Sequence, residues 1–386
     1  MKKILSFLLT LIMFLSFITP IYANDLKLAE KAKSAILIEA STGEILFEKN
    51  ADEKLHPASM TKMMSMLLII EAIEDGVLKW DQVIQVSENA SSMGGSQILL
   101  ETGEKMSVLD LFKGVAIASG NDAVVALAEA VAGSESNFVS MMNKRAKELG
   151  LTNTNFKNPH GLDDDNHYST SRDMSIIAKE LVKHDEVLKY TKVYEDYLRE
   201  NTDRKIWLVN TNRLVRFYDG VDGLKTGYTE KAGYCMTATA MKDGMRIIAV
   251  VMGEETSKIR NQEVSEMLDY AFAQYKVVNM LSNKNLGKYR VSNGKEEYVN
   301  VVPTSEVTML KKKSESNDNL SYEVKVKNLK APIKKGDNIG NLIIKENGNA
   351  VRTLTLTTDK DIPKASFLDL FLRNIKDMII GNMNLY

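Results

Sequence analysis

The pattern of apolar residues along the chain first predicts one long buried helix. From Met60 to Ile73 nearly every residue is apolar, so the segment is long enough for a helix but has too little polar surface for an exposed one. Pro57 and Ser59 stand where such a helix would begin. We therefore predict a central helix that starts near Ser59 and is buried on all sides.

Strand-like stretches lie at both ends of the segment that contains this helix. They are residues 35–40 and 45–49, which flank a turn at 41–44, and residues 234–241 and 245–252, which flank Asp243-Gly244, a dipeptide typical of hairpins. Helices are predicted between them up to about Tyr197, including 108–131 and 138–149; the sheet resumes from Leu224, and a further helix follows at 261–275. This order predicts an α/β (α+β) domain over residues 24–276, with one antiparallel sheet flanked by helices.

The pattern changes at about Val277. Short alternating stretches at 322–326, 341–345 and 351–357 predict a small all-β domain over residues 277–360. Within it, Lys311-Lys312-Lys313 heads a polar segment that runs to Asn319. We interpret this segment as the solvated tip of a hairpin.

The last residues, 361–386, predict an amphipathic helix with a start signal at Pro363 and Ser366. Apolar side chains fall largely on one helical face and charged ones mostly on the other; the apolar set is Phe367, Leu368, Leu370, Phe371, Ile375, Met378 and Ile379, and the charged set is Asp369, Arg373, Lys376 and Asp377. The segment is too short and too charged to span a membrane. We expect it to anchor the protein on a membrane surface, the alternative being a helix that packs on its own β domain.

The N-terminus predicts export. Lys2 and Lys3 precede an apolar run from Ile4 to Ile18, and Ala23 offers a small residue for cleavage before Asn24. Ser6, Thr10 and Ser16 interrupt the run, and it ends at Pro20, which favours a signal peptide at residues 1–23 over a retained transmembrane helix. The mature protein is then expected at the outer face of the cytoplasmic membrane.

Charge and cysteine content narrow the choice of function. The formal net charge of −1 gives no basic surface of the kind that binds nucleic acid. Cys235 is the only cysteine, so no intramolecular disulfide can form. It lies within a predicted strand, and we interpret it as a small buried residue and not as a catalytic thiol.

The candidate chemistry begins with Ser59-Met60-Thr61-Lys62 at the start of the buried helix. Residues three apart lie on the same helical face, so the Ser59 hydroxyl and the Lys62 amine can meet. A lysine is a poor base in water, but desolvation beside other cations lowers its pKa and lets it take the serine proton. The same short pattern recurs at Ser292-Asn293-Gly294-Lys295, where Asn-Gly instead indicates a hairpin turn.

Two further motifs follow in order, Ser119-Gly120-Asn121 and Lys225-Thr226-Gly227. The second lies on a predicted strand near the edge of the sheet, where a substrate backbone could add as another strand. Lys225 and Thr226 would then meet a carboxylate, and Gly227 would let the substrate approach closely. A nucleophile, a base, a proton relay and an anion clamp together indicate acyl transfer.

The ordered motifs resemble those of penicillin-binding proteins. More closely, the chain is similar to the low-molecular-mass serine D-alanyl-D-alanine carboxypeptidases, and the similarity runs from about Ala35 to the C-terminus. Further motifs carry it: His56-Pro57-Ala58, Ser119-Gly120-Asn121-Asp122-Ala123, His160-Gly161-Leu162-Asp163, and Asp222-Gly223 before Lys225 with Ala232-Gly233-Tyr234 after it. The resemblance implies the serine penicillin-recognising fold, a peptidoglycan pentapeptide ending in D-Ala-D-Ala as substrate, and covalent binding of β-lactam antibiotics.

The resemblance also implies roles for the catalytic residues. Ser59 would be the acylated nucleophile and Lys62 its base. Ser119 would relay the proton toward the leaving D-alanine, and Asn121 would hold the substrate amide or Lys62.

Other positions would bind the substrate. Lys225 and Thr226 would bind its terminal carboxylate, together with Arg260. The backbone N–H groups of Ser59 and Tyr228 would form the oxyanion hole, where charge develops in the tetrahedral intermediate. The residue after Lys-Thr-Gly is often histidine in the family, so Tyr228 keeps the backbone role but departs from the family at the side chain.

Three other functions remain open. A β-lactamase would need a Glu-x-x-Leu-Asn segment for fast deacylation, and none lies between Asn121 and Lys225, so we expect a stable penicilloyl adduct. A transpeptidase or endopeptidase would share the acyl-enzyme, and a non-enzymatic penicillin-binding sensor would share the fold. Sequence does not determine whether water or an amine accepts the acyl group.

A metal site is the remaining alternative. His160 and His167 lie beside three aspartates, but their spacing matches no common zinc motif. We interpret this segment as a hydrogen-bonded loop that floors the site, and we expect neither a metal nor another cofactor.

Overall fold

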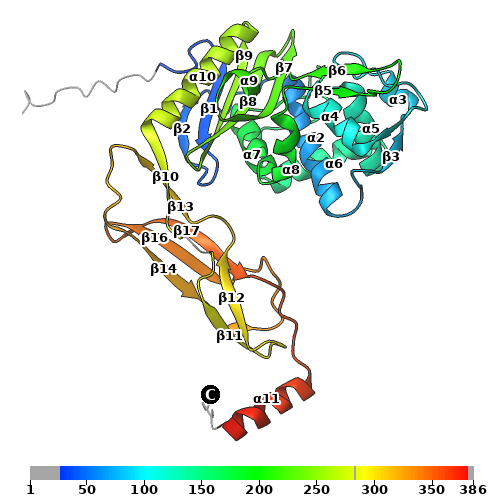
Figure 1. Ribbon diagram of the computed structural model, residues 1–386. Coiled ribbons are helices and arrows are strands. Elements are labelled where there is room, and N and C mark those ends of the chain that lie inside the picture. Colours follow the sequence, from blue (N-terminus) through cyan, green and yellow to red (C-terminus); the bar gives the residue numbers. More distant parts are fainter. Residues whose placement is uncertain (1–26, 282–283, 381–386) are drawn as a thin grey trace, which may run out of the picture.

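The computed structural model describes residues 27–281 and 284–380, so the predicted signal peptide lies outside the described residues. The chain forms a helix-and-sheet domain, a β domain and a C-terminal helix, one after another along the molecule (Figure 1). The first domain contains one five-stranded antiparallel sheet with the strand order β2-β1-β9-β8-β7. These strands are β1 (Ser34–Glu39), β2 (Ile45–Lys49), β7 (Val221–Thr229), β8 (Gly233–Lys242) and β9 (Met245–Glu254).

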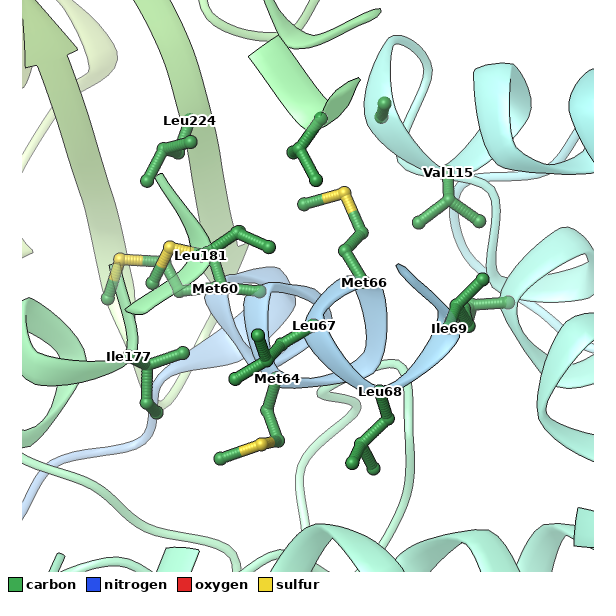
Figure 2. Close-up of a cluster of buried hydrophobic side chains, with 14 of the residues drawn as sticks. Met60, Met64, Met66, Leu67, Leu68, Ile69, Val115, Ile177, Leu181 and Leu224 are labelled. Atoms are coloured by element: carbon green, nitrogen blue, oxygen red, sulfur yellow. The ribbon is translucent and has the colours of Figure 1, made fainter. Parts of the chain in front are cut away.

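The central helix is present where the apolar run predicts it. It comprises a 3-10 turn, η1 (Ala58–Thr61), followed by α2 (Lys62–Glu74). Met63, Met66 and Leu67 have no exposed surface, and Figure 2 shows how the side chains of this helix pack against neighbouring elements. Burying an aliphatic side chain contributes about 1.5–3 kcal/mol. The apolar side chains of α2 belong to the larger of the two cores that flank the sheet, so the helix contributes strongly to the stability of that core.

Other helices surround α2 on one side of the sheet, whereas α10 covers the opposite side. The helices of this domain are α3 (Glu88–Ser91), α4 (Val108–Ala116), α5 (Asn121–Ala132), α6 (Glu135–Glu148), α7 (Ser171–Leu181), α8 (Asp185–Thr191), α9 (Leu214–Phe217) and α10 (Ser257–Gln274). The predicted continuous helix at 108–131 is wrong, because the chain breaks between α4 and α5. Ser119 lies in that break with a φ of 64°, a left-handed conformation that no helix continues.

Two small hairpins complete the first domain. They are β3 (Val83–Gln85) with β4 (Lys105–Ser107), and β5 (Glu195–Leu198) with β6 (Ile206–Val209). In the main sheet the predicted Asp243-Gly244 hairpin is correct, since both residues have positive φ, 49° and 75°, as a tight two-residue turn requires. Cys235 on β8 has no exposed surface, and burial raises the pKa of its thiol to about 11.

The β domain is connected through a ribbon of β10 (Tyr275–Asn279) and β13 (Thr308–Lys312). Its main sheet has the order β14-β16-β17-β12-β11-β15. These strands are β11 (Lys288–Ser292), β12 (Tyr298–Pro303), β14 (Leu320–Val326), β15 (Leu329–Lys330), β16 (Gly340–Glu346) and β17 (Asn349–Thr358). The predicted all-β character is therefore confirmed, and Ser292–Lys295 forms the turn between β11 and β12.

The interpretation of the 311–319 segment as a hairpin tip is wrong, although residues 312–319 are exposed, as the interpretation expected. Strands β13 and β14 pair with different partners, so the segment crosses from the ribbon to the main sheet. Lys311 is buried, and its amine donates to Glu346 Oε1 at 2.7 Å and to the Ser316 carbonyl at 2.6 Å. The local run of lysines in the sequence could not predict this ion pair, because its two partners lie 35 residues apart.

Candidate active site

Ser59 and Lys62 meet at the junction of the 3-10 turn and α2. The Lys62 Nζ atom lies 3.1 Å from the Ser59 Oγ atom, within reach for proton transfer. The same amine donates to Asn121 Oδ1 at 2.6 Å and to the His160 carbonyl at 2.8 Å. Three segments far apart in the sequence thus hold one amine against the hydroxyl.

The electrostatic surroundings of Lys62 favour the neutral form of its amine. Its side chain is fully buried, and its pKa lies well below the usual value because burial disfavours the charged form and the nearby Lys225 cation repels it. Asp122 opposes this shift. A neutral amine becomes accessible at a much lower pH than in water, as general-base catalysis requires.

Ser119 is placed for a different role. It follows α4 and lines the same cavity as Ser59, and its buried Oγ atom has no hydrogen-bond partner among the residues that the structure describes. A buried hydroxyl without a partner costs about 1–3 kcal/mol. This hydroxyl is therefore available to an incoming polar group.

Lys225, Thr226 and Gly227 lie on β7, the predicted edge strand of the sheet. The Lys225 amine donates to the Thr226 carbonyl at 3.3 Å, and burial followed by repulsion from Arg260 lowers its pKa to about 7. Arg260 is itself buried, in the first turn of α10, which begins one turn before the predicted residue 261. Two desolvated cations next to each other form a site that an anion would stabilise.

The structure shows why a side chain does not fit at Gly227, and the cause differs from the predicted one. A Cβ atom at this position would lie 2.9 Å from Ala58 Cβ, 2.9 Å from the Pro57 carbonyl oxygen and 3.0 Å from the Ser59 nitrogen. The missing side chain therefore lets the 3-10 turn approach β7, in addition to any approach by substrate. The same contact brings the Ser59 backbone N–H beside the strand that carries Tyr228, the second oxyanion donor of the prediction.

A cavity of about 760 Å³ joins these residues. Of the predicted residues, those that line it are Ser59, Ser119, Thr226, Gly227, Tyr228 and Arg260. Lys62, Asn121 and Lys225 lie behind this lining and are buried. The Tyr228 side chain is half-exposed, with its ring centroid 4.3 Å from that of Tyr234.

Sequence reasoning missed part of the cavity wall. The additional lining residues are Ser96, Val209, Asn210, Thr211, Arg213, Tyr234, Ser257, Lys258 and Asn261. The Asn210-Thr211-Asn212 triplet was the available signal, because asparagines outside helices often fix loop backbone through their side chains. Here Asn212 Nδ2 donates to the Gly223 carbonyl at 2.9 Å, which fixes the segment beside β7.

The loop that contains His160 and His167 forms part of the buried site, as predicted. The His160 carbonyl accepts from Lys62, while burial, then repulsion from Lys62, lowers the pKa of its imidazole to about 3. A Cβ atom on Gly161 would lie 1.9 Å from the Ala58 carbonyl oxygen. Within residues 27–281 and 284–380, no three His, Cys, Asp or Glu side chains gather in a way that could hold a metal ion.

An antiparallel sheet flanked by helices, with Ser-x-x-Lys at the start of a buried helix and Lys-Thr-Gly on the facing edge strand, defines the class of penicillin-recognising serine enzymes. The chain belongs to the D-alanyl-D-alanine carboxypeptidase family, whose model matches residues 23–256. Residues 275–364 match the C-terminal domain of penicillin-binding protein 5. The predicted family and activity class are thereby confirmed.

Individual relatives agree with this assignment. The chain is 50% identical over 384 residues to D-alanyl-D-alanine carboxypeptidase DacF of Bacillus subtilis (strain 168), which covers 98% of this chain and 99% of that protein. Penicillin-binding protein 5 from Haemophilus influenzae has a TM-score of 0.70 at 33% identity, covering 86% of this chain and 98% of that one. Penicillin-binding protein D2 from Listeria monocytogenes, in its cefotaxime-bound form, has a TM-score of 0.57 at 32% identity and covers 63% of this chain and 97% of that one.

Proposed function

We propose that this protein removes the terminal D-alanine from peptidoglycan pentapeptide stems through an acyl-enzyme on Ser59. The observation that carries the proposal is the contact of the buried Lys62 amine with the Ser59 hydroxyl at 3.1 Å. Lys62 takes the serine proton, and the Ser59 oxygen attacks the carbonyl between the two D-alanines. The N–H groups of Ser59 and Tyr228 stabilise the oxyanion.

The remaining residues complete the cycle. Ser119 passes the proton to the departing D-alanine nitrogen, and Asn121 holds Lys62 in place. Lys225, Thr226 and Arg260 bind the terminal carboxylate. Water then attacks the acyl carbon, the bond to the Ser59 oxygen breaks, and the tetrapeptide leaves with a new terminal carboxylate. A proton from the water regenerates the Ser59 hydroxyl.

Product analysis tests the proposal. Purified mature protein is given a soluble peptidoglycan pentapeptide, and free D-alanine, tetrapeptide and cross-linked dimer are quantified. Equal amounts of D-alanine and tetrapeptide are the expected result. Dimer in the presence of an amine acceptor would indicate a transpeptidase, and penicillin binding without any product would indicate a non-enzymatic sensor.

The selectivity for a free carboxylate should depend on the charge of Lys225. Amidating the substrate C-terminus is expected to lower kcat/KM at least about tenfold at pH 6, since a charge-assisted contact is worth roughly 1.5–3 kcal/mol. The pKa of Lys225 is lowered to about 7, so the cation and the preference both weaken as pH rises through 7 in the free enzyme.

The measurement is the ratio of kcat/KM for acid and amide substrates between pH 5.5 and 8.5. Lys225→Met should abolish most of the preference and flatten its pH dependence. Equal rates on acid and amide with the wild-type enzyme would remove Lys225 from this role.

We further propose that the protein is exported and works at the outer face of the cytoplasmic membrane. Residues 1–23 would be the cleaved signal, 24–276 the catalytic domain, 277–360 the β domain and 361–386 the anchor. Helix α11 (Phe367–Ile380) lies at the end of the β domain that is remote from the catalytic domain (Figure 1). In the described part of the chain no helix is long and apolar enough to cross a membrane.

The exposure of α11 supports a surface anchor over a helix buried on the β domain. Arg373 Nη2 donates to the Gly294 carbonyl at 2.9 Å, so the helix touches that domain through a polar contact. Five of its described apolar side chains are nevertheless exposed, namely Phe367 at 84%, Leu368 at 62%, Phe371, Leu372 and Ile375. An exposed apolar face next to charged residues suits the interface of a bilayer.

Truncation before Lys364 is expected to release the protein from membranes without loss of penicillin binding. Several apolar side chains at roughly 1.5–3 kcal/mol each would suffice for reversible attachment. The measurement is co-sedimentation of full-length mature and truncated proteins with liposomes that contain anionic lipid. Identical partition of the two proteins would show that the tail is not an anchor.

A further inference from the structure

One wall of the active-site cavity is a loop that has no role in the proposed catalytic steps. This wall loop, residues 94–100, contributes Ser96 to the cavity lining. It also binds Asn121 twice, because the Asn121 backbone N–H donates to the Ser96 carbonyl at 2.7 Å and Asn121 Nδ2 donates to the Gly94 carbonyl at 2.7 Å. The position of the wall loop is therefore transmitted directly to Asn121.

The contact with Gly94 decides which way the Asn121 amide faces. A carbonyl oxygen can only accept, so the amide NH₂ group must face Gly94 and the amide oxygen must face Lys62. That oxygen lies 2.6 Å from the Lys62 amine. If the Gly94 carbonyl moved away, the amide could rotate and present an N–H donor to Lys62, which would then lose an acceptor.

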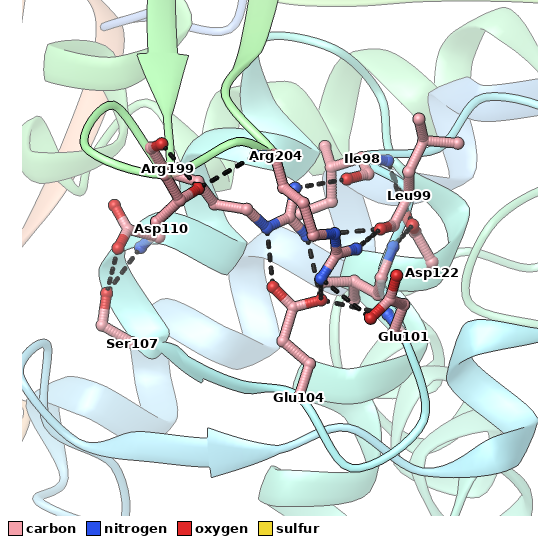
Figure 3. Close-up of polar contacts among 11 residues, drawn as sticks. Ile98, Leu99, Glu101, Glu104, Ser107, Asp110, Asp122, Arg199 and Arg204 are labelled. Carbon is pink, nitrogen blue, oxygen red and sulfur yellow. Dashed lines mark hydrogen bonds and ion pairs between the residues drawn. The ribbon is translucent and has the colours of Figure 1, made fainter.

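Two arginines hold the wall loop from the turn between β5 and β6 (Figure 3). Arg199 Nη1 donates to the Ile98 carbonyl at 2.9 Å, and Arg204 Nη2 donates to the Leu99 carbonyl at 2.7 Å. Glu104 binds both guanidinium groups, at 2.6 Å from Arg199 Nε and 3.0 Å from Arg204 Nη1. The Arg199 and Glu104 side chains are only 9% and 13% exposed, so solvent screens their interaction weakly.

The loop is also fixed from the inside. Asp122 accepts from the Ile98 and Leu100 backbone N–H groups at 3.0 Å each, and it is the residue after Asn121 on α5. Leu99, between these two contacts, has a φ of 55°, a conformation that leucine adopts only when its surroundings enforce it. The two arginines bind the outward carbonyls of the same short segment.

We propose that Arg199, together with Glu104, is a positioning pair that locks the Asn121 amide so that it accepts from the Lys62 amine. Arg199 holds Ile98, the wall loop holds the amide through Gly94, and the amide oxygen holds the base against Ser59. The proposal rests on the base role of Lys62 in the proposed function. Neither Arg199 nor Glu104 lines the cavity, so their effect acts through the loop.

Arg199→Gln tests the proposal, with penicillin acylation as the readout. The second-order acylation rate constant is expected to fall about 10- to 100-fold, the effect of displacing a reacting group by about 1 Å. The kinetic pKa of the base should also fall, because a rotated amide no longer stabilises the Lys62 ammonium. The other titratable groups facing Lys62 are Lys225, Asp122 and His160, and none of them is substituted in this variant.

Arg172→Gln is the matched control. Arg172 makes a similar ion pair, at 2.7 Å from Glu48 and 2.7 Å from Asp52, away from the wall loop. Its loss should leave the acylation rate constant and the kinetic pKa unchanged. If Arg199→Gln does not fold, Glu104→Gln removes the ion pair while sparing the carbonyl contacts, and a smaller change in the same direction is expected.

A double variant distinguishes positioning from a general loss of structure. In an Asn121→Ala background there is no amide to lock, so Arg199→Gln should add little further loss. Fully additive losses, or a wild-type rate and kinetic pKa in folded Arg199→Gln, would overturn the proposal. Because the readout is acylation, these results stand even if wild-type protein releases no D-alanine, the outcome that would reject the proposed function.

Discussion

Replacing Ser59 by alanine is expected to abolish covalent labelling by penicillin and release of D-alanine. The variant lacks the nucleophilic oxygen, although Lys62 keeps its contacts with Asn121 and the His160 carbonyl. We expect a loss of about a thousandfold or more, since only binding and oxyanion stabilisation would remain. Intact-mass spectrometry after incubation with penicillin measures the adduct directly, and peptide mapping locates it.

Ser292→Ala is the matched control, because Ser292 begins the second Ser-x-x-Lys of the chain. That serine ends β11 at a turn, and the lysine of its motif, Lys295, is exposed. Labelling of this variant should equal that of the wild-type protein. An adduct that persisted in Ser59→Ala would assign the nucleophile to another residue.

Replacing Lys62 by methionine is expected to lower the acylation rate constant about 10²- to 10⁴-fold, the usual contribution of a general base. Methionine approximately preserves the buried volume at a position with no exposed surface. Noncovalent binding of the substrate carboxylate should change less, because Lys225 and Arg260 remain. Stopped-flow acylation with a chromogenic β-lactam measures the rate, and thermal unfolding verifies the fold.

Lys62→Arg separates the two ways in which this lysine could act. Arginine keeps a positive charge but does not lose its proton in proteins. A base role predicts that the arginine variant is as slow as the methionine variant. Near wild-type acylation by Lys62→Arg would show that the position supplies charge and not proton transfer.

Local chemistry explains why much of the fold was predictable. The run of apolar residues after Ser59 has one favourable location, the middle of the domain, and α2 lies there. Asp243-Gly244 requires a turn with two positive φ values, and the structure has it. The break at Ser119 was missed because the apolar helical pattern continues on both sides of it, although Gly120 and Asn121 are weak helix formers. The Asp122 bonds to the wall loop fix the chain at this point.

Those residues of the candidate site that belong to sequence motifs were predictable. The sequence placed Ser59, Lys62 and the edge strand with Lys225, and the structure brings them into one site. It could not place Ser96 there, since this serine belongs to a segment with no chemical signal of its own. Lys311 shows the same limit in the β domain, because the carboxylate that allows its burial is 35 residues away.

The buried Cys235 makes this protein easy to label at a chosen position. Its thiol has no exposed surface and a pKa raised to about 11, so alkylating reagents at neutral pH meet almost no thiolate. A single cysteine introduced on the surface would be the reactive one, and Cys235 would not need to be replaced. A spin label or fluorophore on the wall loop or on α11 could then report loop movement or contact with a bilayer in the otherwise wild-type protein.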